Sequence, residues 1–216
     1  LSVMTGLAAD KPTLLTQVDQ QKMMAWTDSV FNTLSMDERI GQLFMVIADV
    51  KTTNQNMQRL LRYVNELNIG GVLFHKGSPE VQAQLTNRMQ EASKVPLLVS
   101  LDGEWGLSMR LSGTTRFPKN MMLGAIENDL LIRKYGEEVA RQCKEMGIHI
   151  NFAPDLDVNS NVDNPVIGIR SFGEDPAAVA DKGIAYASGL EEGGIMAVAK
   201  HFPGHGDTSD DSHETL

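Results

Sequence analysis

The sequence is poor in cysteine and contains no common zinc-binding motif. Cys143 is the only cysteine among 216 residues, so no disulfide can form within the chain. Neither H-E-x-x-H nor C-x-x-C occurs anywhere in it. No apolar run approaches the roughly 18 residues that span a membrane, which argues against a transmembrane helix. No G-x-G-x-x-G follows an expected strand, and this weakens a dinucleotide-binding interpretation.

Basic residues are the minority among the charged ones. There are 19 Lys and Arg against 28 Asp and Glu, which gives a formal net charge of −9. Nucleic-acid binding requires a basic patch, so this balance argues against a nucleic-acid partner. The acidic residues are spread along the chain, as expected of an ordinary solvated surface. A hydrophobic content of 42% at this length is enough for one sizeable globular core.

The N-terminal segment carries little pattern. Residues 1–16 are mixed and small, and we expect a poorly ordered lead-in to a domain over residues 17–216. The first residue is Leu1 and not methionine, as expected where a leader has been removed. An extracytoplasmic location, periplasmic or secreted, is therefore expected.

Apolar strands and amphipathic helices alternate along the rest of the chain. Short apolar runs predict strands at residues 43–47, 72–74, 96–101, 148–153 and 194–199. Helical spacing and capping signals predict helices at residues 18–34, 54–67, 79–93, 128–146 and 176–193. Ser35 and Glu38 form a capping-box pattern ahead of a further short helix. This order predicts an α/β fold with a parallel sheet buried on both faces. Periodicity alone does not separate a doubly wound sheet from a (β/α)8 barrel.

The densest polar stretch follows the last expected strand. Residues 200–213 read K-H-F-P-G-H-G-D-T-S-D-D-S-H. One interpretation is a solvated surface loop. A second is a metal site with ligands from His201, His205, His213 and either Asp207 or Asp211. The Pro-Gly pair between the first two histidines keeps them off a common helix face, which weakens the metal interpretation. The third interpretation is a catalytic loop, because α/β folds place their sites at the C-terminal ends of strands.

The third interpretation gains support from a resemblance. The pattern K-H-F-P-G-H-G, four residues and then D-S-H resembles the signature of the family 3 glycoside hydrolases, in particular their β-N-acetylglucosaminidase branch. Residues 167–172, I-G-I-R-S-F, resemble the family's I-G-x-R-S-F. Residues 102–106, D-G-E-W-G, resemble its D-x-E-G-G, with Trp105 in place of a glycine. The segment N-F-A-P-D-L-D-V at 151–158 is also similar, so the likeness runs from about Ser35 to His213.

The resemblance implies a fold and an activity. The fold would be a TIM-type (β/α)8 barrel, with the N-terminal five-strand portion present and the rest beyond the C-terminus. The activity would be that of a retaining exo-glycoside hydrolase that removes terminal β-linked N-acetylglucosamine from cell-wall or chitin-type saccharides. Transfer to phosphate in place of water is a variant that the same machinery would permit. The partner would be a carbohydrate, with neither metal nor cofactor.

The resemblance also implies roles for particular residues. His213 and Asp211 would form the general acid/base dyad. The sugar-binding residues would be Asp102, Arg170, Lys200 and His201. The aspartate nucleophile of the family comes from a later strand end and is expected beyond Leu216.

Several of these positions have plainer alternatives. Arg170 would instead form a structural salt bridge, with Asp155 or Asp157. Asp157 itself is expected to support a loop. Trp105 is expected to pack against the loop above the barrel more readily than to stack on a sugar, and His75 is expected to be structural. For the whole chain, the alternatives are a non-catalytic sugar-binding or interaction module and a metal-dependent hydrolase.

Overall fold

The computed structural model describes residues 19–48 and 54–211. The expected lead-in at 1–16 and His213 lie outside these ranges. The described chain begins with α1 (Gln20–Phe31) and α2 (Met36–Gly41), and then alternates strands and helices. The strands are β1 (Met45–Ala48), β2 (Gly71–Phe74), β3 (Leu98–Leu101), β4 (Ile150–Asn151) and β5 (Met196–Ala197). The long helices between them are α3 (Asn54–Leu67), α4 (Pro79–Ala92), α6 (Asp129–Glu145) and α7 (Pro176–Glu192).

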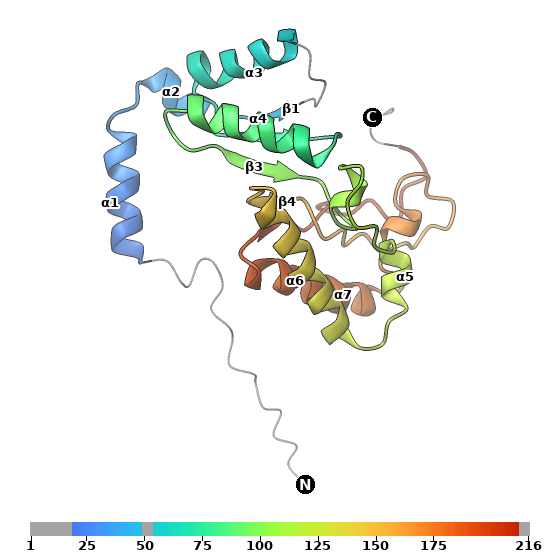
Figure 1. Ribbon diagram of the computed structural model, residues 1–216. Coiled ribbons are helices and arrows are strands. Elements are labelled where there is room, and N and C mark those ends of the chain that lie inside the picture. Colours follow the sequence, from blue (N-terminus) through green and yellow to red (C-terminus); the bar gives the residue numbers. More distant parts are fainter. Residues whose placement is uncertain (1–18, 49–53, 212–216) are drawn as a thin grey trace.

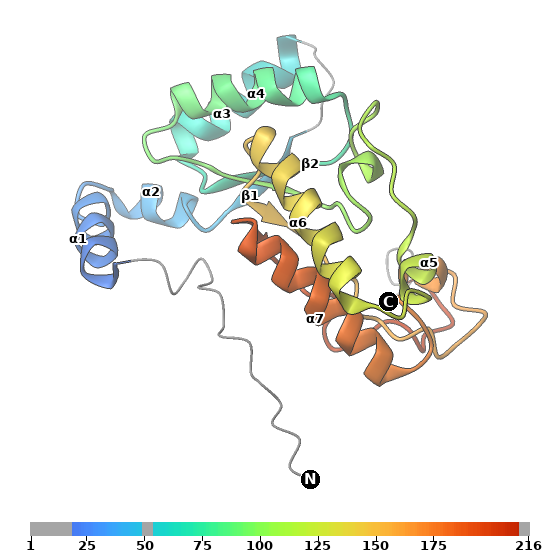
Figure 2. The ribbon, with the colours of Figure 1, turned by 60° about the horizontal axis from the view of Figure 1, so that its bottom comes forward.

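The strand order of the sheet distinguishes a doubly wound fold from a barrel, which periodicity alone did not. Its strands are all parallel and lie in the order β1-β2-β3-β4-β5, so each strand pairs with the next one along the chain. A doubly wound sheet reverses its strand order at a switch point, whereas a TIM-type barrel does not. Figures 1 and 2 show α3 and α4 beside one end of the sheet and α6 and α7 side by side at the other. The prediction of five strands of a barrel-type α/β fold is confirmed.

Local signals place the starts of α2, α4 and α7 as expected. The Ser35 hydroxyl accepts a hydrogen bond from the backbone N–H of Glu38, whose side chain accepts from the backbone N–H of Ser35, so the capping box is confirmed. Ser78 and Asp175 cap α4 and α7, each with a proline in the first turn. Three short elements were not expected: the 3₁₀ helices η1 (Leu107–Met109) and η2 (Gly168–Arg170), and the helix α5 (Asn120–Gly124).

The core lies between the sheet and its helices. Its largest fully buried side chains are those of Tyr186, Phe74, Leu60, Met89, Leu97, Leu101, Leu107, Leu111, Ile132, Ile148, Ile167 and Leu190. Cys143 is buried in α6, and burial raises the pKa of its thiol to about 12.

Apolar side chains remain exposed at the β1 edge and on α1. Leu43, Phe44 and Ile47 are exposed at this edge of the sheet. No residue of α1 is buried, although the sequence predicted an apolar face on this helix, and Figure 1 shows it apart from the sheet and from α3, α4, α6 and α7. Exposed apolar side chains at a sheet edge are consistent with further barrel strands packing there. None of the helices in the described part of the chain is long and apolar enough to cross a membrane.

Candidate active site

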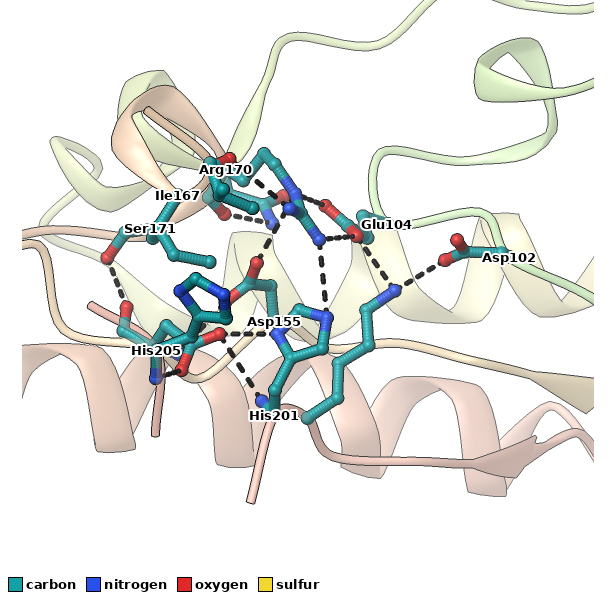
Figure 3. Close-up of polar contacts among 12 residues, drawn as sticks. Asp102, Glu104, Asp155, Ile167, Arg170, Ser171, His201 and His205 are labelled. Carbon is teal, nitrogen blue, oxygen red and sulfur yellow. Dashed lines mark hydrogen bonds and ion pairs between the residues drawn. The ribbon is translucent and has the colours of Figure 1, made fainter. Parts of the chain in front are cut away.

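The C-terminal ends of three neighbouring strands deliver a cluster of charged side chains. Asp102 and Glu104 follow β3, Asp155 and Asp157 follow β4, and Lys200 and His201 follow β5. Arg170 comes from η2, in the long loop between β4 and α7. Figure 3 shows the side chains of Asp102, Glu104, Asp155, Arg170 and His201 pointing toward one another. The four residues predicted to bind sugar, Asp102, Arg170, Lys200 and His201, therefore lie at one end of the sheet.

Lys200 joins the two carboxylates that follow β3. Its Nζ lies 2.5 Å from Asp102 Oδ1 and 2.7 Å from Glu104 Oε1. The Glu104 side chain is fully buried, whereas Asp102 keeps about a quarter of its side chain exposed, at 24%. Burial works against ionisation of Asp102, but Lys200 and Arg110 outweigh it and hold the pKa of this carboxyl below its usual value. Asp102 is therefore a partly accessible carboxylate at neutral pH.

Arg170 is held by a buried, two-pronged ion pair. Its Nε and Nη2 donate to the two oxygens of Glu104 at 3.0 and 2.7 Å, and its Nε also lies 3.6 Å from Asp155 Oδ2. The structural salt bridge considered from the sequence thus exists, with Glu104 as its main partner. This arrangement does not remove Arg170 from the site, because its Nη2 reaches to 3.4 Å from His201 Nε2 (Figure 3).

Asp157 fixes the orientation of His201. Its Oδ2 lies 2.5 Å from His201 Nδ1, and its Oδ1 accepts a hydrogen bond from the backbone N–H of His205 at 2.6 Å. Because a carboxylate faces Nδ1 and the Arg170 guanidinium faces Nε2, the neutral imidazole carries its proton on Nδ1. Burial works against ionisation of Asp157, but the bonds from His201 and His205 outweigh it and lower its pKa. The expectation that Asp157 supports a loop is confirmed.

Asp155 is a buried carboxyl group with an unusual environment. It is fully buried, one oxygen accepts the Asp157 backbone N–H at 2.9 Å, and Oδ2 has no hydrogen-bond partner. Burial raises its pKa to about 8, and the nearby charges of Glu104 and Asp157 act in the same direction. At neutral pH Asp155 is therefore protonated. Around it, Lys200 and Arg110 contact Asp102, and Lys200 and Arg170 contact Glu104.

The same groups are poorly suited to a metal ion. Asp155, Asp157 and His201 each place a polar atom within 4.8 Å of the others. However, both Asp157 oxygens already accept protein hydrogen bonds, and Arg170 lies beside both His201 and Asp155. A cation here would displace these bonds and face the guanidinium charge. The alternative ligand set considered from the sequence includes His213, which lies outside the described residues, so it stays untested; within the described residues, His205 Nδ1 lies 2.8 Å from Thr208 Oγ1.

Sequence reasoning missed Arg110. Its Nη2 and Nε bind Asp102, at Oδ2 (2.5 Å) and at the backbone oxygen (2.9 Å), and its Nη1 lies 3.3 Å from His75 Nε2. No local motif marks Arg110, because it lies in the irregular stretch after β3. Trp105 is half-buried with Lys119 Nζ 5.0 Å from its ring centre, which agrees with packing against the loop above the sheet.

A cavity opens beside the charged cluster. It has a volume of about 590 Å³ and lies between the loops after β4 and β5, with Asp157, Lys200 and His201 in its wall. Phe202 and Pro203 form part of its rim, and Phe202 is almost completely exposed. Asp211 is the last described residue and is half-buried. The dyad of Asp211 and His213 stays a prediction.

Comparisons with known proteins agree with this geometry. The model of the "Glycosyl hydrolase family 3 N terminal domain" matches residues 35–216. "Beta-hexosaminidase A" of Pseudoalteromonas piscicida is 38% identical over an alignment of 170 residues that covers 73% of this chain and 28% of that protein. "Beta-N-acetylglucosaminidase/beta-glucosidase" of Cellulomonas fimi is 32% identical over 190 residues, which is 88% of this chain and 33% of that protein.

Solved structures give the same result. A family 3 β-N-acetylglucosaminidase from Paenibacillus sp. str. FPU-7 matches with a TM-score of 0.75 and 35% identity, over 83% of this chain and 35% of that one. The "Beta-glucoside phosphorylase BglX bound to 2FGlc" matches with a TM-score of 0.83 and 26% identity, over 93% of this chain and 35% of that one. The chain thus spans about a third of the length of these relatives. With a family model that covers most of its length, the chain belongs to glycosyl hydrolase family 3.

Proposed function

We propose that the complete protein is a retaining exo-glycoside hydrolase that removes terminal β-linked N-acetylglucosamine. The observation that carries this proposal is the convergence of Asp102, Arg170, Lys200 and His201 on one polar cluster. Each sugar hydroxyl both donates and accepts hydrogen bonds. A mixture of carboxylate acceptors and cationic donors therefore suits a pair of neighbouring hydroxyls. The names of the relatives supply the sugar, since they describe β-hexosaminidases and β-N-acetylglucosaminidases.

The chemistry requires two further groups. Retention requires a nucleophile on one face of the sugar and an acid/base next to the leaving group. We assign the acid/base to His213, oriented by Asp211, because a histidine near neutrality can protonate a leaving oxygen and later deprotonate water. The nucleophile would be an aspartate in residues that follow Leu216, on the barrel strands that complete the sheet. Cell-wall or chitin-type saccharides outside the cytoplasm are the proposed substrates.

Phosphorolysis is a second candidate. It is favoured by the likeness to a structure named as a β-glucoside phosphorylase, at a TM-score of 0.83. In this variant phosphate attacks the glycosyl-enzyme in place of water. The two candidates differ in the product, which would be a sugar 1-phosphate or the free sugar.

The test uses the full-length protein and an aryl β-N-acetylglucosaminide. We expect aryl alcohol release that a chelator does not change, with the sugar product first formed in the β configuration. Adding phosphate separates the two candidates through the appearance of a sugar 1-phosphate. Saccharide binding without turnover would support the binding-module alternative, and loss of activity with chelator would support the metal-dependent hydrolase.

A further inference from the structure

The side chain of Asn164 joins two loops of the site. It is 8% exposed. Its Nδ2 donates to the backbone oxygens of His205 at 2.7 Å and Thr208 at 3.0 Å, in the loop after β5. Its Oδ1 accepts from the backbone N–H groups of Val166 at 2.9 Å and Ile167 at 2.7 Å. An amide has two N–H donors and one oxygen with two lone pairs, so Asn164 uses its full capacity.

The two loops are in close contact around this side chain. Asn161 Nδ2 donates to the Thr208 backbone oxygen at 3.1 Å, and the Asn161 backbone N–H donates to Gly206 at 3.2 Å. At Gly206 the backbones approach so closely that a Cβ would lie 1.7 Å from the Val158 oxygen. The loop after β5 is therefore held at a defined place as far as Thr208.

The positions that Asn164 joins both belong to the proposed machinery. On one side it holds Val166 and Ile167, which lead directly into η2 and Arg170. On the other side it holds Thr208, three residues before Asp211. A fixed anchor at Thr208 limits where the following residues can reach, because a short stretch of chain spans only about 3.3–3.6 Å per residue.

We propose that Asn164 is a positioning residue for the proposed acid/base dyad, because it holds the loop that leads to Asp211, at Thr208, to the segment that carries Arg170. This inference rests on the proposed function. In this role Asn164 does not itself touch the reacting atoms. It acts by fixing the position of Thr208, three residues before Asp211, relative to the sugar-binding residues. A small displacement of a catalytic group is enough to slow a reaction strongly.

The test is Asn164→Asp in the full-length protein. The change keeps size and the oxygen that accepts from Val166 and Ile167, but replaces the two donors with a second acceptor that repels the carbonyl oxygens of His205 and Thr208. Asn128→Asp is the matched control. Asn128 is exposed and caps α6 by accepting the Leu130 N–H, which an aspartate does equally well. Asn161→Asp is a milder second variant, since it removes one donor to Thr208.

Two readouts follow. With an unactivated saccharide, turnover of the Asn164→Asp protein should fall about ten- to hundredfold, which is part of the roughly 10²- to 10⁴-fold contribution of general acid catalysis. With an aryl glycoside of low leaving-group pKa, the bond-breaking step should fall less than about threefold, with KM little changed. Hydrogen exchange should speed up at the amides of residues 205–211 and stay unchanged in the strands.

The outcomes separate this inference from the proposed function. Equal losses on both substrates, a rise in KM alone, or unchanged exchange at residues 205–211 would overturn the role of Asn164. A wild-type protein that releases no N-acetylglucosamine would overturn the proposed function. The exchange measurement would still decide whether Asn164 anchors the loop. If the Asn164→Asp protein does not fold, Asn161→Asp must show the same pattern at smaller size, and its absence would contradict the inference.

Discussion

Replacing Asp155 with asparagine should stabilise the protein, and the gain should grow as pH rises from about 5 to about 8. Asp155 is fully buried and one of its oxygens lacks a hydrogen-bond partner. Asparagine has nearly the same shape and keeps an oxygen for the Asp157 N–H, which Asp155 accepts at 2.9 Å. The asparagine amide carries no ionisable group, so no charge is placed in this buried position at any pH.

The sign and size of the effect follow from proton linkage. Burial raises the folded-state pKa of Asp155 to about 8, whereas in the unfolded chain it is about 3.9. The protonated group therefore contributes stability that is fully present below the unfolded pKa and is lost as pH rises through the folded pKa. Between the two, one extra proton on the folded state changes the free energy of unfolding by about 1.4 kcal/mol per pH unit. The Asp155→Asn protein does not lose this stability as pH rises. Its free energy of unfolding, relative to that of the wild type, should therefore increase by at most about 4 kcal/mol between pH 5 and pH 8.

The assay is denaturant unfolding of both full-length proteins at several pH values between 5 and 8. Asp163→Asn is the matched control, because Asp163 is exposed in the loop after β4. We expect the difference between Asp155→Asn and wild type to increase with pH, and the control to show no such trend. A difference that stays constant, or that turns against the variant as pH rises, would mean that Asp155 is ionised in the fold and paired with Arg170. The assignment of Asp155 as a protonated group would then be wrong.

Two further substitutions test the close loop contact and the buried ion pair. Gly206→Ala should destabilise the protein by roughly 1–3 kcal/mol in thermal or denaturant unfolding, because its Cβ would lie 1.7 Å from the Val158 oxygen. Gly173→Ala, where nothing lies within 4 Å of the added carbon, should be nearly neutral, and equal effects of the two changes would contradict the contact. Arg170→Lys removes the two-pronged bond to Glu104 and should raise KM for N-acetylglucosaminides about tenfold or more, since a charged hydrogen bond contributes about 1.5–3 kcal/mol. An unchanged KM in steady-state kinetics would remove this residue from the sugar site.

Much of the fold was predictable because its signals are local. The helix at 54–67 was predicted with the bounds that the structure has, and the caps at Ser35 and Ser78 follow from the preference of hydroxyl side chains for helix starts. Four of the five strands were predicted longer than they are, since an apolar run marks burial and not pairing, whereas β2 was predicted one residue shorter than it is. Strand order was not predictable from periodicity, because it depends on contacts between segments far apart in the chain; only the resemblance pointed to a barrel.

The site was predictable in part for the same reason. Asp102 and Lys200 directly follow strands, so their position at one end of the sheet could be inferred. Glu104 was visible in the D-G-E-W-G segment, but its partner Arg170 is 66 residues away, and no local pattern links them. The protonation of Asp155 is a consequence of burial, which only the folded structure reveals. No motif in the sequence identified Arg110 as part of the site.

The most direct test of the central claim is the response of His213→Ala to the leaving group, measured in the full-length protein. If His213 is the acid/base, the bond-breaking step should slow by roughly 10²- to 10⁴-fold on an unactivated saccharide and hardly at all on an activated aryl glycoside, whose leaving group departs without a proton. Asp211→Asn should show the same pattern more mildly, because the imidazole remains but loses its orienting charge. A chelator should change neither result. Equal losses on both kinds of substrate would contradict the assignment of His213 as the acid/base, and chelator sensitivity would point to a metal-dependent hydrolase.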